Sequence, residues 1–328
     1  MTSPALGPRQ EAQARLETLE PGVYEARVLE PSPPPVTEGP WFADDPVAPA
    51  PRSARTLVSP VPNADLTWDD LARDAPTLQP WCAERWLGAW SRLQPVPDPD
   101  AFAATRGAWH QLAEHVLAPA RYRVTGTLGL RYTRHGFGTP YLDGPDQQLR
   151  VEDAALVVVG DKDRRVRAET LRVAAAAVGL DSEADTGVYE PATAAQPDAP
   201  LTIDAEAAAR LGDWFGFGAS VLEELRAAAP GRDATRVQLW PEHFDLSVDL
   251  GDDDARQRGT FGASPGDEAH PLPYLYVTHW SSVPDDPFWS DAAFAGASLG
   301  YPELLAAADQ RRAGLAFFRR GQAVLAGV

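Results

Sequence analysis

Cysteine and lysine are almost missing from this chain of 328 residues, which has one of each, Cys82 and Lys162. A single cysteine excludes an intramolecular disulfide and a zinc site built from several thiolates. Long apolar runs are also missing. No stretch approaches the ~18 apolar residues of a membrane-spanning helix, and the N-terminus lacks the apolar core of a signal peptide. These absences predict a cytoplasmic protein.

Positive charge is scarce as well. Lys and Arg total 29 against 47 Asp and Glu, which gives a formal net charge of −18 and a sequence pI near 4.7. Such a charge repels the phosphate backbone of nucleic acids and the surface of anionic membranes. We therefore expect neither nucleic acid nor a membrane among the partners. The hydrophobic fraction of 44% is normal for a globular protein, so a packed core is expected.

Proline is concentrated near the N-terminus, where 13 of the 32 prolines lie within the first 62 residues. Proline removes backbone hydrogen-bond donors and favours extended conformations. Residues 1–62 are therefore predicted to form an extended, proline-rich arm. Residues 63–328 are predicted to form a single globular domain built of two similar halves, about 63–180 and 201–328.

The first half of the predicted domain contains helices and strands. Apolar residues at helical spacing predict two helices, and in the second of them Trp109 lies on the apolar face and Pro119 is expected to end the helix. Alternation of apolar and polar residues predicts the strands. The predicted elements are helices over residues 79–94 and 100–118, strands over 121–133 and 149–159, a helix over 168–178 and a linker over 181–200.

The second half repeats this order of elements. Asp204 can cap a helix whose apolar face includes Trp214 and Leu222. The other predicted elements are a strand over residues 235–250, a loop over 251–267, a strand over 272–280 and a final helix from Tyr301. The sequence therefore predicts an α+β fold in which two antiparallel β units, each flanked by helices, share one core.

The predicted strand over residues 235–250 changes its phase at a proline. Apolar residues stand at odd positions before the proline and at even positions after it. A slip of one residue indicates a β-bulge, which tolerates proline and re-aims side chains near sites. Past the bulge, His243, Asp245, Ser247 and Asp249 share one face, with the first two ~7 Å apart. This face is either a ligand or metal site or the solvated face of an ordinary antiparallel strand.

Groups that bind metals or transfer protons are concentrated between residues 236 and 280. Nitrogen and oxygen ligands of the types present there suit Zn²⁺, Mn²⁺ or Fe²⁺. Glu242 is the candidate general base. For His270 the alternative is an exposed loop histidine without a ligand. The candidate metal ligands are His243, Asp245, Asp267, Glu268 and His270.

Two other groups are candidates for ligand binding. Arg121, Arg123 and Arg131 form a positive stripe on the strand predicted over residues 121–133. The stripe could receive a carboxylate or phosphate, unless neighbouring acids neutralise it. Ser264 lies in GASPG, which matches the G-x-S-x-G pattern of a hydrolase nucleophile. Prolines in and after this segment prevent a following helix and leave an oxyanion hole without its N–H donor. We therefore interpret GASPG as a tight turn whose amides can hold an anionic group.

Several distinctive segments resemble a family of uncharacterised actinobacterial conserved-hypothetical proteins. The segments are WCAERWLGAW (81–90), HGFGTPYL (135–142), LGDWFGFG (211–218), RVQLWPEHFDL (236–246) and GASPGDEAHPLPYLYV (262–277). The resemblance covers residues 30–320 or so. It implies a cytoplasmic globular protein and, because no activity is assigned to the family, no reaction.

Two functional hypotheses are consistent with these observations. The first is a protein that binds a small molecule or takes part in a non-catalytic interaction, since Walker loops, dinucleotide fingerprints and zinc-finger spacings are missing. The second is a metal-dependent hydrolase that uses His243, Asp245 and His270. A cleft lined by residues 241–247 and 262–270 is the predicted ligand site. The proline-rich arm could dock on a partner protein of unknown identity.

Overall fold

The computed structural model describes residues 91–133, 135–139, 142, 147–159, 164–181, 187–228, 235, 237–252, 254–281 and 286–327. The arm predicted over residues 1–62 lies outside the described residues, as does the helix predicted over residues 79–94 up to residue 90.

The described residues contain helices and strands of ordinary length. The helices are α5 (Pro99–Leu112), the π-helical segment η4 (Ala113–Leu117), α6 (Ala118–Thr125), α7 (Leu171–Ala177), α8 (Ala205–Ala228), α9 (Tyr301–Ala306) and α10 (Gln310–Leu325). The first set of strands is β1 (Arg131–Thr133), β2 (Gly136–Gly138), β3 (Gln148–Glu152), β4 (Ala155–Val159) and β5 (Arg164–Arg167). The second set is β6 (Gln238–Trp240), β7 (Asp245–Leu250), β8 (Gly259–Ser264), β9 (Tyr274–His279) and β10 (Gly296–Gly300).

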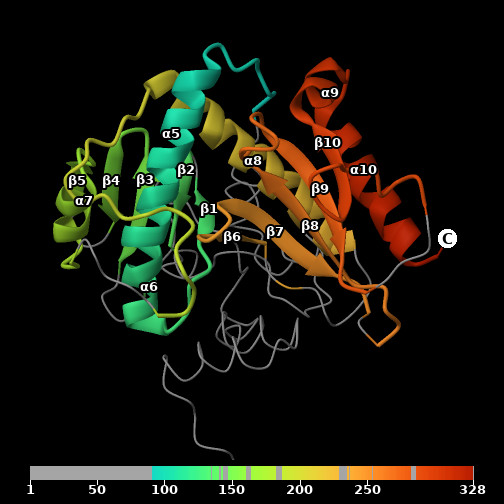
Figure 1. Cartoon of the computed structure of the whole chain (residues 1–328), viewed down its shortest axis with the longest axis horizontal. Helices are drawn as coiled ribbons and strands as arrows, with labels where there is room; N and C mark the ends of the chain where they lie inside the picture. Colours follow the sequence, from blue (N-terminus) through green and yellow to red (C-terminus); the bar gives the residue numbers. More distant parts are fainter. Residues whose placement is uncertain are drawn as a thin grey trace, which may run out of the picture.

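Each set of strands forms a five-stranded antiparallel sheet (Figure 1). The strand orders are β1-β2-β3-β4-β5 and β10-β9-β8-β7-β6, so each strand pairs with its neighbours in sequence. The sheets meet where β1 adjoins β6. There the N–H of Leu130 donates to the carbonyl of Leu239 (2.7 Å), and the N–H of Leu239 donates back (2.8 Å). The prediction of an α+β fold with two antiparallel β units is confirmed.

One hydrophobic core joins the two sheets. The ring of Phe137 in β2 contacts Trp109 of α5, Phe215 of α8 and Phe244 between β6 and β7, with centroid distances of 5.6, 6.4 and 5.3 Å. All four side chains are at most 1% exposed. Helix α8 contacts β1 and β2 of the first sheet and β7 and β8 of the second. The predicted shared core is therefore confirmed.

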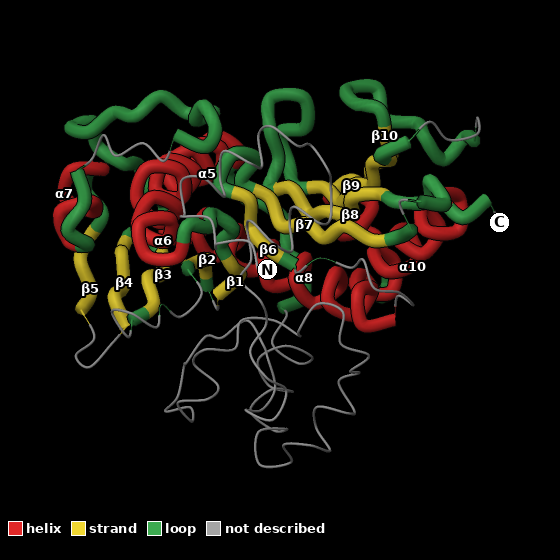
Figure 2. The backbone as a smooth tube through the Cα atoms, turned by 90° about the horizontal axis from the view of Figure 1, so that it is seen from below, coloured by secondary structure: helices red, strands yellow, loops and turns green. Residues whose placement is uncertain are grey.

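The helices cover one face of the second sheet. Figure 2 shows α8 and α10 on the same side of β7, β8 and β9; α8 contacts β7 and β8, and α10 contacts β8 and β9. The side chains on that side are apolar, because Leu246, Ala263 and Leu275 lie in one row across the three strands. The residues between them in sequence point to the other face. That face carries the candidate site.

The helix that begins with α5 continues past Pro119, contrary to the prediction. The π-helical segment η4 ends two residues before this proline, which lacks the N–H that would bond to the carbonyl of His115. Helix α6 then ends at Gly126, which has a φ of +71°. The predicted strand over residues 121–133 is therefore wrong up to Thr125, and only β1 at its end is a strand.

Two predicted strands are hairpins. The strand predicted over residues 149–159 is β3 and β4, which turn at Asp153 with a φ of +51°. The strand predicted over residues 235–250 is β6 and β7, joined by a four-residue turn that ends at Phe244 with a φ of +53°. Chain reversal pairs odd Leu239 with even Leu246, which produces the change of phase. The β-bulge prediction is wrong for this reason.

The other predicted elements are largely confirmed. Helix α8 begins after Asp204, whose Oδ1 accepts from the N–H groups of Glu206 (3.0 Å) and Ala207 (2.9 Å). Helix α7 and strand β9 also lie where they were predicted. The loop predicted over residues 251–267 contains β8, the final helix is two helices, α9 and α10, and β10 was not predicted.

Candidate functional site

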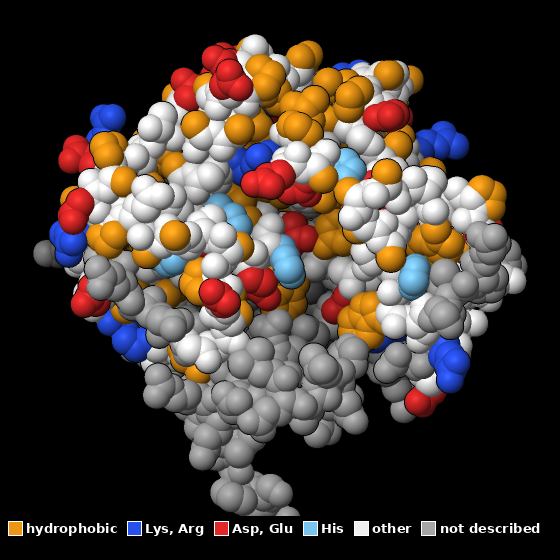
Figure 3. All heavy atoms as spheres, viewed as in Figure 1, with side chains coloured by type: hydrophobic (Ala, Val, Ile, Leu, Met, Phe, Trp, Pro, Cys, Tyr) orange, Lys and Arg blue, Asp and Glu red, His pale blue; other side chains and the backbone are white. Residues whose placement is uncertain are grey.

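A pocket of about 720 Å³ lies on the open face of the second sheet. Figure 3 shows a hollow on this side of the molecule, with acidic and histidine side chains gathered around it. Strands β6 to β9, the turn before β7 and two loops contribute its walls. The lining residues are Trp240, Glu242, His243, Asp245, Ser247, Asp249, Thr260, Ser264, Asp267, Ala269, His270, Tyr274, Tyr276, Thr278, Trp280, Ala293 and Phe294.

The floor of the pocket follows from strand register. Across β7, β8 and β9, one row consists of Ser247, Gly262 and Tyr276, and the next of Asp249, Thr260 and Thr278. The same face also carries Asp245, Ser264 and Tyr274, each two residues from the member of the first row on its own strand. Polar side chains therefore form a continuous surface above an apolar layer.

Asp245 is the most unusual group on this floor. The residue is 5% exposed, and Oδ2 of its carboxyl group accepts a hydrogen bond from the Tyr276 hydroxyl. Its Oδ1 is buried and has no hydrogen-bond partner among the described residues. Burial raises the pKa of Asp245, against the opposing effects of His243 and of the Tyr276 hydrogen bond. A buried carboxyl oxygen without a partner is costly to a folded protein, so a hydrogen-bond donor at this atom would be stabilising.

Asp249 is the second buried carboxyl group of the floor. Its Oδ1 accepts from the Thr260 hydroxyl at 2.7 Å, and that hydroxyl accepts from the indole N–H of Trp280 at 2.9 Å. Burial raises the pKa of Asp249, while the Thr260 hydrogen bond and the charge of Arg258 oppose this effect. The guanidinium carbon of Arg258 lies 4.6 Å from the Trp280 ring centroid. Asp249 is thus better satisfied than Asp245.

A glycine allows Tyr276 to reach Asp245. A Cβ atom at Gly262 would lie 2.3 Å from atoms of the Tyr276 ring, so the ring occupies the space that a side chain on β8 would need. Burial raises the pKa of Tyr276 well above its ordinary value, and the charge of Asp245 adds to this effect. The hydroxyl therefore remains a hydrogen-bond donor over the physiological pH range.

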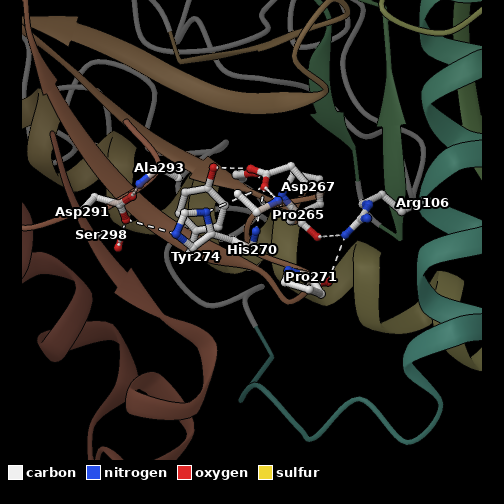
Figure 4. A network of polar contacts seen from close by, with 12 residues as sticks. Arg106, Pro265, Asp267, His270, Pro271, Tyr274, Asp291, Ala293 and Ser298 are labelled. Carbon is white, nitrogen blue, oxygen red and sulfur yellow. Dashed lines mark hydrogen bonds and ion pairs between the residues drawn. The ribbon is translucent and has the colours of Figure 1, made fainter. Parts of the chain in front are cut away.

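The loop between β8 and β9 forms one rim of the pocket (Figure 4). Asp267 organises it: Oδ1 accepts from the N–H groups of Ala269 (2.7 Å) and His270 (2.8 Å), and Oδ2 accepts from the Tyr274 hydroxyl (2.6 Å). Burial opposes ionisation, but these hydrogen bonds outweigh it and lower the pKa of Asp267. Arg106 of α5 holds the outside of the loop by donating to the carbonyls of Pro265 (3.4 Å) and Pro271 (3.0 Å).

His270 connects this rim to the segment before β10. Its Nε2 lies 3.1 Å from Oδ2 of Asp291, which also accepts from the Ser298 hydroxyl at 2.5 Å. Burial opposes ionisation of Asp291, but the hydrogen bonds of Ser298 and the Ala293 N–H outweigh it and lower its pKa. His270 is therefore part of a structural network rather than an isolated loop histidine.

Most of the predicted site residues meet in this pocket. Glu242, His243, Asp245, Ser264, Asp267 and His270 line it, whereas Glu268 is exposed and does not. Within the described part of the chain, however, no three His, Cys, Asp or Glu side chains lie close enough to hold a metal ion together. The predicted ligand set for Zn²⁺, Mn²⁺ or Fe²⁺ is therefore not assembled, because Asp267 and His270 are engaged in the rim.

The predicted arginine stripe does not exist. Arg121 and Arg123 lie on helix α6, because the strand predicted there is helical. Arg121 is 2% exposed, and Arg123 donates to the carbonyls of Gly179 (2.7 Å) and Val178 (3.0 Å). Arg131 is fully buried and donates to Oε1 of Gln238 at 3.1 Å. None of these three arginines lines the pocket, so they are not its ligand-binding groups.

Ser264 lies at the end of β8, and its Oγ accepts from the N–H of Gly266 at 3.1 Å. A strand precedes it where a loop was predicted, and the segment that follows in the described structure is a loop and then β9. The interpretation of GASPG as a tight turn is wrong for its first three residues, which belong to β8, and the loop begins only at Pro265. As a pocket-lining residue, Ser264 remains a candidate for ligand contact.

The sequence interpretation missed most of the aromatic part of the site. Trp240, Tyr274, Tyr276, Trp280 and Phe294 all line the pocket. The alternation in the segment from Tyr274 to Thr278 carried the signal for the tyrosines, since every second residue there points to one face. The position of Phe294 depends on the loop before β10, which has no periodic pattern.

Comparisons with known proteins do not narrow the function. No protein-family model matches the chain, and no curated protein or solved structure is significantly similar to it. The resemblance to an actinobacterial family remains a prediction. None of the helices in the described part of the chain combines the length and apolar character needed to cross a membrane.

Proposed function

We propose that this protein binds a small polar molecule in the pocket above β7, β8 and β9. The observation that carries the proposal is the unpartnered Oδ1 of Asp245, buried at the floor of a cavity of about 720 Å³. Cavities of about 300–1,000 Å³ with aromatic walls and a few polar groups are typical of ligand sites. A ligand that donates a hydrogen bond to Oδ1 would remove the free-energy penalty of that atom.

Preorganisation of the pocket supports the proposal. The Tyr276 hydroxyl orients the Asp245 carboxyl group, and Thr260 orients that of Asp249. Arg106 and His270 tie the rim to other segments of the chain, and Asp267 holds the loop together from within. Groups that are already positioned lose less conformational entropy when a ligand binds. The acidic composition and the single cysteine support a cytoplasmic location for this binding protein.

Thermal unfolding in the presence of small molecules tests the proposal. The full chain is heated with panels of cationic, neutral polyhydroxyl and anionic compounds at millimolar concentration. We expect at least one compound to raise the midpoint of unfolding, since binding to the folded state stabilises it. Ser247 lies in the central row of the floor and is 4% exposed, so Ser247→Phe should fill the pocket and abolish the effect.

Thr202→Phe serves as the matched control, because Thr202 is exposed and does not line the pocket. This variant should keep the ligand-induced stabilisation. The proposal is wrong if no compound of the three panels stabilises the protein. It is also wrong if the stabilisation persists in Ser247→Phe.

A further inference from the structure

We infer that the ligand of this pocket is a small organic cation whose ammonium or guanidinium group pairs with Asp245 and lies against the aromatic walls. This inference rests on the proposed function and specifies its ligand class. It follows from three features of the pocket: its charged groups, the free oxygen of Asp245 and its aromatic side chains.

The charged groups around the pocket are predominantly acidic. Four carboxylic acids line it: Glu242, Asp245, Asp249 and Asp267. None of the described lining residues is Lys or Arg, and the basic side chains among them are His243 and His270. An anionic ligand would therefore meet carboxyl groups without a permanent cation to pair with.

Two arginines interact with residues around the pocket without lining it. Arg106 donates to carbonyls of Pro265 and Pro271 on the rim, and Arg258 lies against the ring of Trp280 and acts on Asp249. Neither arginine lines the pocket. The basic group that acts on Asp245 is the neighbouring His243.

The free oxygen of Asp245 specifies where the cation binds. Its Oδ2 is occupied by the Tyr276 hydroxyl, and its buried Oδ1 faces no donor among the described residues. An N–H group of an ammonium or guanidinium ion would form a charge-assisted hydrogen bond there, which is about twice as strong as a neutral one. An ionised carboxylate in a buried position is tolerated only when it is paired, so a cation suits this atom better than a neutral donor.

The aromatic walls provide a second, independent attraction. Tyr274, Tyr276 and Phe294 form a cluster with ring centroids 6.1 to 6.3 Å apart, and Trp240 and Trp280 also line the pocket. The faces of these rings carry negative charge density and attract cations within about 6 Å of the ring centroid. An anion would be repelled by the same faces.

Cation binding is expected to release a proton. Burial raises the pKa of Asp245, and the other titratable groups that act on this carboxyl group or are affected by it are Glu242, His243, Asp249, Tyr274 and Tyr276. The cation favours the ionised form of Asp245. Affinity should therefore increase as the pH rises through the pKa of Asp245 in the free protein.

Isothermal titration calorimetry of the full chain tests the inference. The cationic probes are 1,4-diaminobutane, agmatine and tetramethylammonium, the neutral probe is methyl glucoside, and the anionic probe is citrate. The titrations are made at about 0.15 M salt, where the Debye length is about 8 Å, to suppress general attraction to a chain of net charge −18. We expect at least one cation to bind, with proton release and with an affinity that increases with pH.

Two Asp→Asn substitutions distinguish binding in the pocket from general attraction of cations to the negatively charged chain. Asp245→Asn should weaken cation binding about tenfold or more, which corresponds to the loss of one charge-assisted contact. Asp254→Asn, at an exposed position outside the pocket, should leave it unchanged. Ser247→Phe should abolish it. The pH dependence of the unmodified chain provides a readout that does not rely on the folding of any variant.

The outcomes distinguish this inference from the proposed function. If methyl glucoside or citrate binds, the cations do not, and Ser247→Phe removes the binding, the pocket is a ligand site but the cation inference is wrong. If cations bind equally well to Asp245→Asn or to Ser247→Phe, the inference is wrong because they bind elsewhere. If no probe binds, the cation inference is wrong, and the thermal-unfolding panels decide the proposed function.

Discussion

The ring of Tyr276 lies over the backbone of Gly262, and this position brings its hydroxyl onto Asp245, two strands away. The glycine replaces a side chain that would otherwise stand between β7 and β9 on the pocket face. A strand glycine covered by an aromatic ring on the next strand also recovers packing that the glycine lacks. The central contact of the candidate site therefore depends on a residue that makes no polar contact itself.

Gly262→Ala should disrupt this contact. The new Cβ would lie 2.3 Å from the Tyr276 ring, so the ring must move and its hydroxyl must leave Asp245. We expect a loss of about 1–3 kcal/mol in the free energy of unfolding, measured with urea. Gly107→Ala in α5 is the matched control, because nothing lies within 4 Å of its Cβ. It should stabilise the protein by about 0.5–1 kcal/mol, and equal effects of the two substitutions would contradict the argument.

Asp245→Asn should stabilise the free protein, and more so at higher pH. Burial raises the pKa of Asp245 in the folded protein above its ordinary value of 3.8. Below pH 3.8 the group is protonated in both states and does not lower the free energy of unfolding. As the pH rises through the folded-state pKa, the buried group must ionise and the free energy of unfolding decreases. Asparagine does not ionise and avoids this loss. Each unit by which the pKa is raised corresponds to about 1.4 kcal/mol.

The measurement is urea unfolding of both proteins at a series of pH values from 3 to 8. The difference in unfolding free energy should be small at the acidic end and should increase toward neutral pH. Asp254→Asn reports the general effect of removing one negative charge from an acidic chain. A difference that stays constant with pH would show that Asp245 does not titrate as we describe.

Arg106→Met should loosen the rim of the pocket. Arg106 donates to the carbonyls of Pro265 and Pro271, and methionine retains the apolar stem but removes these hydrogen bonds. We expect a loss of about 1 kcal/mol in unfolding free energy and faster amide hydrogen exchange at Ala269 and His270, whose N–H groups bond to Asp267.

Arg172→Gln is the control for the loss of an arginine. Arg172 pairs with Asp198 at the surface, at 2.7 Å, and solvent screens this pair. The control should change neither stability nor exchange at the rim by much. Unchanged exchange at Ala269 and His270 in Arg106→Met would mean that the loop keeps its conformation without the arginine.

Metal analysis of the untagged, freshly purified protein should find no stoichiometric Zn, Mn or Fe. The physical reason is that no three potential ligands converge within the described residues. His243→Ala, analysed in parallel, should give the same result. Near-stoichiometric metal that disappears in His243→Ala would instead support the metal-dependent hydrolase hypothesis.

Local patterns in the sequence predicted much of the second sheet and its helices. Alternation placed Asp245, Ser247 and Asp249 on one face of β7, and Asp204 marked the start of α8. These features depend on residues a few positions apart, for which period and capping are reliable guides. The same reasoning failed at Pro119, because a π-helical turn accommodated the proline within the helix. It failed again between β6 and β7, because a tight turn and a bulge change the phase of an alternating pattern in the same way.

The arginines show why the candidate site was only partly predictable. Arg121 and Arg131 were expected on an accessible stripe, yet both are at most 2% exposed. Their burial depends on a helix in place of a strand and on Gln238, which is 107 residues from Arg131. Nothing near either arginine in sequence indicates these neighbours.

The sequence by itself determined the alternation of the strands, the caps and turns, and the concentration of carboxyl and histidine groups between residues 236 and 280, because these are properties of neighbouring residues. The tertiary structure alone decided that α8 and α10 cover one face of the second sheet and leave the other as a pocket. It also decided that Tyr276 pairs with Asp245 across Gly262. Both outcomes depend on strand register and helix packing, which are set by contacts between segments distant in sequence.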